Sequence, residues 1–348
     1  MKKFIVSVML SLAMVMPLFA GCGDNPNLVV IYTAAEEERV IYLQEKINEQ
    51  FPEYEVVFQL IGTKDFVPRL EGEGLGTDCD IFYDLEAASA EKILESNPNL
   101  FYELSDYDFS IYLDGYTANH HKYAVNGKTD GTILVNKKVL NERGIPVPVT
   151  YEDLTDSVYY NLIAMPHPMS SGTGYAFYNG LLCSTNNEAY TLDYFSRLSN
   201  NVKEYTSSGS KPSRYVKSET VAIGVGLLWQ CVNYANENPT DLEVVFLKKD
   251  SADPAGEASY NLFTMGMISG KQERKAVKDV FDYLYNDLNK TQCEKFNPDK
   301  IYVDQGAAQI PNYPTGFSEI NMQGVLSYTY KKGLFNKWEN AGLPMPTN

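Results

Sequence analysis

Basic residues, tryptophan and histidine are scarce in this chain of 348 residues. It has 29 Lys and Arg against 45 Asp and Glu, so its formal net charge is -16. Nucleic-acid binding needs a dense face of Lys and Arg against the phosphate backbone, and this balance argues against it. The chain has 3 His and 2 Trp and contains no HExxH, GxSxG or Walker A motif. We therefore do not expect an enzyme, and we assign no catalytic residue, no metal site and no cofactor.

Cysteines are few, and long apolar segments are absent beyond the N-terminus. Cys79, Cys183, Cys231 and Cys293 are widely spaced and form no CxxC pair, which disfavours a zinc site. An exported chain permits disulfides and four cysteines allow three full pairings, so bridges stay open beside the favoured alternative of free, buried thiols. No later segment approaches 18 consecutive apolar residues, so we expect no membrane-spanning helix.

The first residues predict export. Two lysines precede an apolar stretch from Phe4 to Phe19, which is typical of a signal peptide. Small residues before Cys22 look like the lipobox of bacterial lipoproteins, in which the chain is cut before a cysteine that is acylated. We predict a lipoprotein signal peptide over 1–21, a tether over 22–27, and anchoring by lipid to the extracellular or periplasmic face of the cell membrane. An ordinary signal peptide with an incidental cysteine is the alternative.

Composition and patterning predict a folded α/β protein of two lobes. Hydrophobic residues make up 44% of the chain and charged residues 21%, as in globular proteins, and the length suggests about two domains. Strand and helix patterns alternate twice along the chain, which is typical of a parallel sheet covered on both faces. The predicted strands are 28–32, 56–60, 80–83, 132–135, 162–165, 221–225 and 243–247, and the predicted helices are 40–51, 175–183, 192–198, 227–236 and 277–288.

One run carries the clearest chemistry. The predicted strand 162–165 leads through two prolines into Ser170–Tyr175, which opens a helix. Glycines let the backbone approach a ligand, hydroxyls donate hydrogen bonds, and the helix contributes free N–H groups and a positive dipole end. Together these groups predict a site for a phosphate, phosphonate or carboxylate. A plain N-cap after a loop is the alternative.

Two further loops follow predicted strands. The run Glu204–Pro212 places hydroxyls around Gly209, although alone it is typical of a solvated turn. The loop Thr33–Glu36 opens the first helix, where it could equally be an acidic N-cap. Open α/β sheets bind ligands beyond the carboxyl ends of their strands, so all three loops are candidates. His167, between two prolines, could touch the ligand or support its loop.

The chain resembles one family over nearly all of its length after the signal peptide. The motifs that carry the resemblance are, in order, YTAAEEE, DIFYD, TILVNKKVL, PVTYEDL, IAMPHPMSSGTGYAFYNGLL, NVKEYTSSGSKP and ETVAIGVG. They look like the solute-binding proteins of bacterial ABC importers of the iron(III), 2-aminoethylphosphonate and organophosphate type. The SSGTGY and YTSSGS motifs are fairly specific to the organophosphorus branch.

The resemblance implies a fold and a function. The fold is the two-lobed α/β fold of type II periplasmic binding proteins, whose hinge-linked lobes close on a ligand in the cleft. Lobe 1 would take 28–125 and 250–303, and lobe 2 would take 126–249 and 304–348. The protein would be a monomer that captures a small anionic solute, a phosphonate or a phosphate ester of the 2-aminoethylphosphonate or sugar-phosphate class. It would deliver this solute to the permease subunits of an ABC importer.

The expected ligand-binding residues come from the three loops and from the turn after the third strand. That turn departs from the family's Gly-Gly-Asp-Ala pattern, since it reads Tyr83 to Ala88, and this marks a different ligand body. Asp84 and Glu86 would accept hydrogen bonds from amine or hydroxyl groups of the ligand. The full set is Thr33, Ala34, Glu36, Asp84, Glu86, Ser170, Ser171, Gly172, Thr173, Gly174, Tyr175, Ser207, Ser208, Gly209 and Ser210.

Three other functions stay open. Iron(III) binders of the family use adjacent tyrosines, but Tyr159-Tyr160 lies outside the family's iron-ligand region, so we assign this pair, like most of the 26 tyrosines, to packing. Iron(III) is therefore the less favoured ligand. A lipoprotein that feeds a two-component sensor would have the same sequence features. An extracellular phosphate-ester hydrolase is the least favoured alternative.

Overall fold

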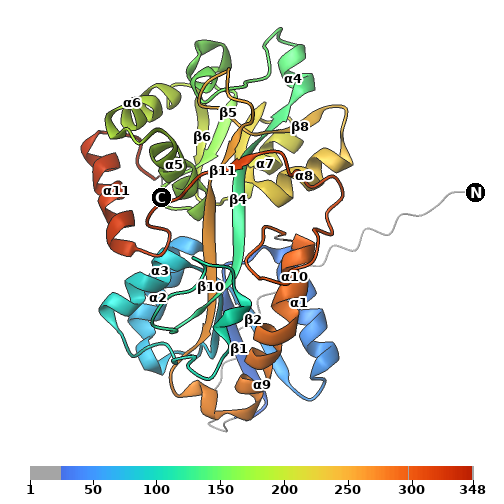
Figure 1. Cartoon of the computed structure of the whole chain (residues 1–348), viewed down its shortest axis with the longest axis vertical. Coiled ribbons are helices and arrows are strands. Elements are labelled where there is room, and N and C mark those ends of the chain that lie inside the picture. The colour runs from blue at the N-terminus through green and yellow to red at the C-terminus, as the bar shows by residue number, and fades with distance from the viewer. Residues whose placement is uncertain (1–24, 297, 347–348) are drawn as a thin grey trace, which may run out of the picture.

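The computed structural model describes residues 25–296 and 298–346, which form two α/β lobes (Figure 1). Figure 1 shows one lobe above the other, with β4 (Ala124–Asn136) and β10 (Tyr260–Met267) running between them. The predicted signal peptide and Cys22 lie outside the described residues. Within the described residues, no helix combines the length and the apolar character needed to cross a bilayer.

The elements follow the expected alternation of strands and helices. The other strands are β1 Leu28–Thr33, β2 Glu55–Leu60, β3 Ile81–Glu86, β5 Ile163–Pro166, β6 Val202–Thr206, β7 Ile223–Leu227, β8 Leu242–Val245, β9 Glu257–Ala258 and β11 Ser318–Glu319. The helices are α1 Glu37–Gln50, α2 Thr63–Glu73, α3 Ala87–Ser96, α4 Lys137–Asn141, α5 Gly172–Thr185, α6 Glu188–Leu198, α7 Lys211–Lys217, α8 Leu228–Glu237, α9 Lys275–Tyr283, α10 Asn289–Phe296 and α11 Tyr328–Asn340, with a π-helical segment Leu284–Leu288 between α9 and α10.

A single curled sheet runs through both lobes in the order β2-β1-β3-β10-β4-β7-β5-β6, with β8 paired to β4. The pairs β1–β2, β1–β3, β5–β6 and β5–β7 are parallel, as the alternation predicts. The two central strands depart from this parallel arrangement. Both β10 and β4 pair antiparallel with their neighbours, because the chain returns through them from one lobe to the other.

Each lobe buries its own core on both faces of its part of the sheet. In β1, Val29 and Ile31 pack with α1, while Val30 and Tyr32 pack with α2 and α3 on the opposite face. A strand buried on both faces reads as a continuous apolar run, which is why β1 is easy to predict. Tyrosine contributes heavily to these cores, which confirms its assignment to packing; fully buried tyrosines include Tyr32, Tyr83, Tyr123, Tyr159, Tyr175, Tyr178, Tyr194 and Tyr302.

The C-terminal segment returns from lobe 1 to lobe 2. Tyr302 still belongs to the lobe 1 core, whereas Leu334 and Trp338 of α11 belong to the lobe 2 core. In Figure 1 the segment from α10 through β11 passes across β4 before it reaches α11. The polypeptide therefore passes between the lobes at β4, at β10 and at this segment.

Charged groups are buried where β4 passes between the lobes. The strand pairs with β10 up to Asp130 and with β7 from Gly131 onward. The backbone N–H of Asp130 donates to Asp299 Oδ2 at 3.0 Å, and Lys128 Nζ lies 3.5 Å from Asp130 Oδ1. Burial and the nearby charge of Asp299 raise the pKa of Asp130 well above its ordinary value, despite the opposing charge of Lys128. Two carboxyls thus share this crossing with one lysine, which also pairs with Glu319.

Candidate functional site

The loop after β5 presents an open helix N-terminus. Ser171 is the residue before α5 and has an extended backbone, but its side chain makes no capping hydrogen bond. The backbone N–H groups of Gly172, Thr173 and Gly174 have no acceptor among the described residues. These donors and the helix dipole favour an anion at this position. Ser171 is therefore not a side-chain cap, and the predicted anion loop keeps its donors available.

Close packing fixes the shape of this loop. A Cβ atom on Gly174 would lie 2.3 Å from the carbonyl oxygen of Pro166, so only glycine fits there. A Cβ atom on Gly209 would lie 2.2 Å from Thr173 Oγ1 and 3.3 Å from Ser171 Oγ. The loop after β6 therefore contacts the loop after β5. The structure brings together the two runs that the sequence analysis selected in lobe 2.

The loop after β6 has an exposed and a buried part. Ser207 and Ser208 are exposed, whereas Ser210 is buried. Ser208 Oγ and Ser210 Oγ lie 3.1 Å apart, and Thr206 Oγ1 donates to the carbonyl of Ser208 at 2.7 Å. These hydrogen bonds give the loop a defined conformation next to Thr173.

Two buried hydroxyls of the anion loop have no hydrogen-bond partner among the described residues. They are Ser170 Oγ and Tyr175 OH. A buried polar group without a partner is costly and rare in folded proteins, and an ordered ligand or water is a common explanation. Both hydroxyls belong to the run that the sequence analysis assigned to an anion.

The ring of His167 stabilises the loop between β5 and α5 through hydrogen bonds to backbone groups. Its Nε2 lies 2.7 Å from the carbonyl oxygen of Pro344, and its Nδ1 accepts from the backbone N–H of Met169 at 3.1 Å. Burial lowers the pKa of His167, although the bond to Pro344 opposes this shift. Both ring nitrogens are occupied by backbone groups, which is the loop-support role that the sequence left open.

The lobe 1 candidates divide into two groups. Thr33 is buried and its Oγ1 accepts from the N–H of Ala35 at 3.1 Å, while Ala34 is half-buried beside it. Glu36 and Asp84 converge instead on Arg39, a residue that the sequence analysis missed. Thr33 and Ala34 therefore shape the end of β1, and the two carboxylates belong to a charged cluster.

Arg39 is the centre of that cluster. Its guanidinium donates to Asp84 at 2.7 and 3.0 Å, to Glu36 at 3.0 Å and to Gln292 Oε1 at 2.6 Å. Burial alone would lower the pKa of Arg39, but the charges of Asp84 and Glu36 raise it well above its usual value, so the guanidinium stays charged. Asp84 has a left-handed backbone (φ 62°), which aspartate tolerates better than most residues.

Glu86 lies between the lobes. Its buried carboxylate accepts from Ser89 Oγ at 2.8 Å and from Asn261 Nδ2 of β10 at 2.9 Å, and it forms an ion pair with Lys331 of α11. Burial would raise the pKa of Glu86, but Lys331 and the two neutral donors outweigh it and the pKa is lowered. The sequence analysis did not predict a role for Asn261 or Lys331, since neither belongs to a recognisable motif.

The tyrosine pair is divided between the core and the surface, and the described cysteines are unpaired. Tyr159 is buried and donates to the carbonyl of Pro146 at 2.9 Å, whereas Tyr160 is exposed, which confirms a packing role for Tyr159. No group of three or more His, Cys, Asp or Glu among the described residues could hold a metal ion. The four cysteines among the described residues are free; Cys79, Cys231 and Cys293 are buried and Cys183 is half-buried.

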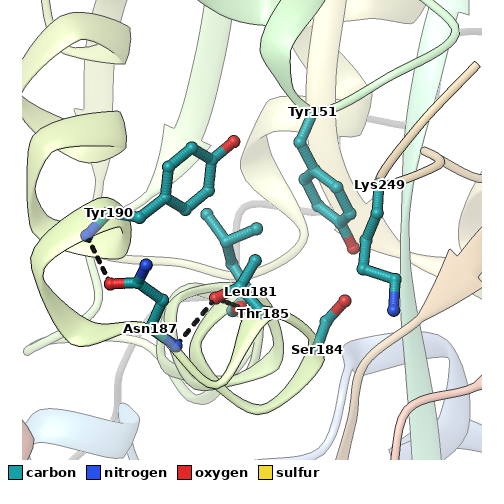
Figure 2. A pocket seen from close by; sticks show the side chains of 7 residues that line it. All are labelled: Tyr151, Leu181, Ser184, Thr185, Asn187, Tyr190 and Lys249. Carbon is teal, nitrogen blue, oxygen red and sulfur yellow. Dashed lines mark hydrogen bonds between the residues drawn. The ribbon is translucent and has the colours of Figure 1, made fainter.

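A separate surface hollow lies at the other end of α5 (Figure 2). Figure 2 shows Ser184 of α5 on the side of Tyr151 and Lys249, whereas Thr185 Oγ1 accepts from the backbone N–H of Asn187. With a rise of about 1.5 Å per residue, the 14 residues of α5 separate this hollow from the anion loop by about 20 Å. The hollow is therefore distinct from the predicted anion loop.

Comparison with known proteins identifies the family. The sequence profile of the bacterial extracellular solute-binding proteins matches residues 56–298. An uncharacterised protein of Haemophilus influenzae is 27% identical over 216 residues, which cover 59% of this chain and 58% of that protein. The chain thus spans less than two thirds of the length of this relative.

Solved structures share the fold. The periplasmic binding protein AfuA of Actinobacillus pleuropneumoniae, solved with fructose-6-phosphate bound, has a TM-score of 0.76 at 18% identity over 90% of this chain and 98% of its own. The periplasmic binding protein P5PA has a TM-score of 0.72 at 19% identity, covering 90% and 99%. The apo ferric ion-binding protein A of Pasteurella haemolytica has a TM-score of 0.69 at 10% identity, covering 92% and 100%. Together with the matched profile, these structures show that the chain is a bacterial extracellular solute-binding protein with the two-lobed type II fold.

Proposed function

We propose that this chain is the solute-binding component of an ABC importer and captures a small anion that carries a phosphate or phosphonate group. The observation that carries the proposal is the N-terminus of α5. There, three backbone N–H groups and the buried hydroxyl of Ser170 have no partner among the described residues. A tetrahedral anion with several acceptor oxygens satisfies all of these donors at once. Neutral donors suffice for this, so the acidic balance of the chain is compatible with an anionic solute.

The proposed contacts come from both lobes. Ser170 to Gly174 hold the anion, and Ser207, Ser208 and Ser210 complete the lobe 2 side through the contact at Gly209. Thr33 and Ala34 face them from lobe 1. Glu36 and Asp84 act through Arg39, because their carboxylates are committed to its guanidinium. Glu86 accepts from a hydroxyl or amine of the solute.

The lipid anchor and the permease complete the proposal. Cys22 carries the lipid and keeps the protein at the membrane, where a monomer delivers its solute to the permease subunits. The family match supports export of the chain, since its members are extracellular.

Calorimetric titration of the purified protein tests the solute class. The panel contains 2-aminoethylphosphonate, sugar phosphates, inorganic phosphate and iron(III). We expect stoichiometric binding of at least one organophosphorus compound and recovery of that compound unaltered. Tight binding of iron(III) alone, with a tyrosine-dependent colour, would contradict the proposal, and release of phosphate from a bound ester would indicate a hydrolase.

Ser170→Ala separates a binding role from a structural one. The hydroxyl has no partner within the described protein, so its removal leaves the free energy of unfolding unchanged or slightly higher. Loss of a hydrogen bond to a charged solute weakens binding by about 10–100-fold. Ser196→Ala, at an exposed serine of the same lobe, is the matched control and leaves both quantities unchanged. Destabilisation by Ser170→Ala with unaltered affinity would refute the assignment.

Cys22→Ser tests the anchor. Acyl chains on this cysteine hold the wild-type protein in the membrane fraction, and the serine variant cannot be acylated. We therefore expect the variant to incorporate no fatty acid and to remain as the uncleaved precursor, which still carries the apolar segment 4–19. Equal recovery of both proteins in the soluble fraction would favour the ordinary signal peptide.

A further inference from the structure

The helix α11 connects the two lobes. Leu334 and Trp338 anchor it in the lobe 2 core, while its first turn lies against α3 of lobe 1. Thr329 Oγ1 donates to Glu95 Oε1 at 3.2 Å across this contact. In Figure 1, α11 lies beside α5 and α6 and reaches down to α3. A side chain on its first turns can therefore contact both lobes.

Lys331 is such a side chain. Only 10% of it is exposed, and its ammonium pairs with the buried carboxylate of Glu86 across the lobes. The same ammonium lies 4.8 Å from the ring centroid of Tyr175, a cation–π distance. Tyr175 belongs to the predicted anion loop, so Lys331 brings a buried positive charge to that loop. The following residue, Lys332, is exposed.

Glu86 places a negative charge at the N-terminus of α5. A Cβ atom on Gly172, the first residue of α5, would lie 3.8 Å from Glu86 Oε1 and 2.8 Å from Asn261 Nδ2. A carboxylate is favoured at this place for the same reason that a phosphate is. The carboxylate of Glu86 and the anion of a solute therefore compete for the same positive end of the α5 dipole.

We propose that Lys331 binds the anion of the solute, and that the anion takes Lys331 over from Glu86 when the lobes close on it. This inference rests on the proposed function and adds a solute-contacting residue from the C-terminal helix. A phosphate or phosphonate carries up to two negative charges against one on Glu86, and it also receives the free N–H groups of α5. It therefore outcompetes the carboxylate for the ammonium.

The exchange also defines the solute class. Once separated from Lys331, Glu86 keeps only the neutral donors Ser89 and Asn261, and a buried carboxylate that loses its cation is strongly destabilised. A hydroxyl or ammonium group of the solute compensates for this loss. The preferred solute is therefore a phosphate or phosphonate that carries a hydrogen-bond donor near its anion.

Calorimetry with a matched pair of probes tests the exchange. The probes are 2-aminoethylphosphonate and ethylphosphonate, which differ by the amine, with inorganic phosphate as the minimal anion. Lys331→Met weakens all three by at least about tenfold, because a charge-assisted contact is lost. Lys331→Arg retains binding within a few-fold, and Lys332→Met at the exposed neighbour changes nothing.

The variant Glu86→Gln distinguishes an exchange of Lys331 between Glu86 and the solute from an ion pair that only stabilises the fold. It removes the competing charge, so ethylphosphonate binds more tightly than to the wild type, while the preference for the aminated probe falls. If Lys331→Met does not fold, the double variant Glu86→Gln/Lys331→Met removes both charges together, and we expect it to bind the probes at least about tenfold more weakly than Glu86→Gln alone.

Three outcomes would overturn the proposal. An affinity of Lys331→Met within twofold of Lys332→Met, or of the double variant within twofold of Glu86→Gln, would remove Lys331 from the site while leaving the proposed function intact. Weaker binding of ethylphosphonate by Glu86→Gln would show that Glu86 does not compete with the anion. Failure of the wild type to bind any phosphate or phosphonate would refute the proposed function and this inference together.

Discussion

Arg39→Met is expected to lower the free energy of unfolding by about 3–5 kcal/mol, because it leaves a buried carboxylate without its cation. Arg39 is 1% exposed and Asp84 is 2% exposed. The guanidinium joins the end of β3 to the start of α1 and to Gln292 of α10. Its loss therefore loosens three elements that border the candidate site.

Urea denaturation followed by circular dichroism measures this effect. Arg143→Met at an exposed arginine is the control and changes the free energy of unfolding by at most about 0.5 kcal/mol. Combining Arg39→Met with Asp84→Asn recovers part of the loss, since the buried negative charge disappears and asparagine accepts the left-handed backbone. A loss of less than about 1 kcal/mol for Arg39→Met would show that the pair contributes as little as a surface ion pair.

The carboxyl pair at the β4 crossing is expected to make the protein less stable as the pH rises. Burial raises the pKa of both Asp130 and Asp299, with the nearby Asp299 charge adding to the effect on Asp130. The folded protein then holds a proton that the unfolded chain has released above its ordinary pKa of about 3.9. The free energy of unfolding therefore falls as the pH rises from the ordinary aspartate pKa of about 3.9 through the raised pKa of the folded pair.

Asp130→Asn isolates this contribution. The amide is neutral at every pH, so the variant has a flatter stability profile and exceeds the wild type at about pH 8. Lys128 keeps its partner Glu319 in the variant. Asp106→Asn, at an exposed aspartate, is the control and follows the wild-type profile. Identical slopes for the wild type and Asp130→Asn would show that the crossing holds no extra proton.

Much of the fold follows from local patterns, and the exceptions have a physical cause. Strands such as β1 and β7 are buried on both faces by apolar side chains and read directly as strands. The sequence predicts only the apolar end of β4, because the preceding segment Asn126–Asp130 is largely polar and yet buried. That segment is stabilised by partners distant in sequence, on β10 and the C-terminal segment. Local patterning carries no signal for such partners, and β10 was missed altogether.

The candidate site likewise has one part that local sequence patterns predict and another that depends on partners distant in sequence. The hydroxyl loops after β5 and β6 are visible in the sequence because glycines and serines cluster there, and the structure places these loops in contact. Whether these residues bind a solute stays a prediction. The ionic partners of the buried carboxylates Asp84 and Glu86 are Arg39 and Lys331, and both were missed because these two pairs form only through tertiary packing. Arg39 and Asp84 lie 45 residues apart in the sequence, and Glu86 and Lys331 lie 245 residues apart, so neither pair produces a local sequence pattern.

The free thiols make the protein suited to optical labelling. Burial raises the pKa of Cys231 and Cys293 to about 12, and it raises that of Cys79 and Cys183 as well, so few thiolates are present near neutral pH. A maleimide dye would therefore react preferentially with cysteines introduced at exposed positions. One dye at position 106 in lobe 1 and another at position 200 in lobe 2 would turn the distance between the lobes into an energy-transfer signal, without removal of any native cysteine from the described chain.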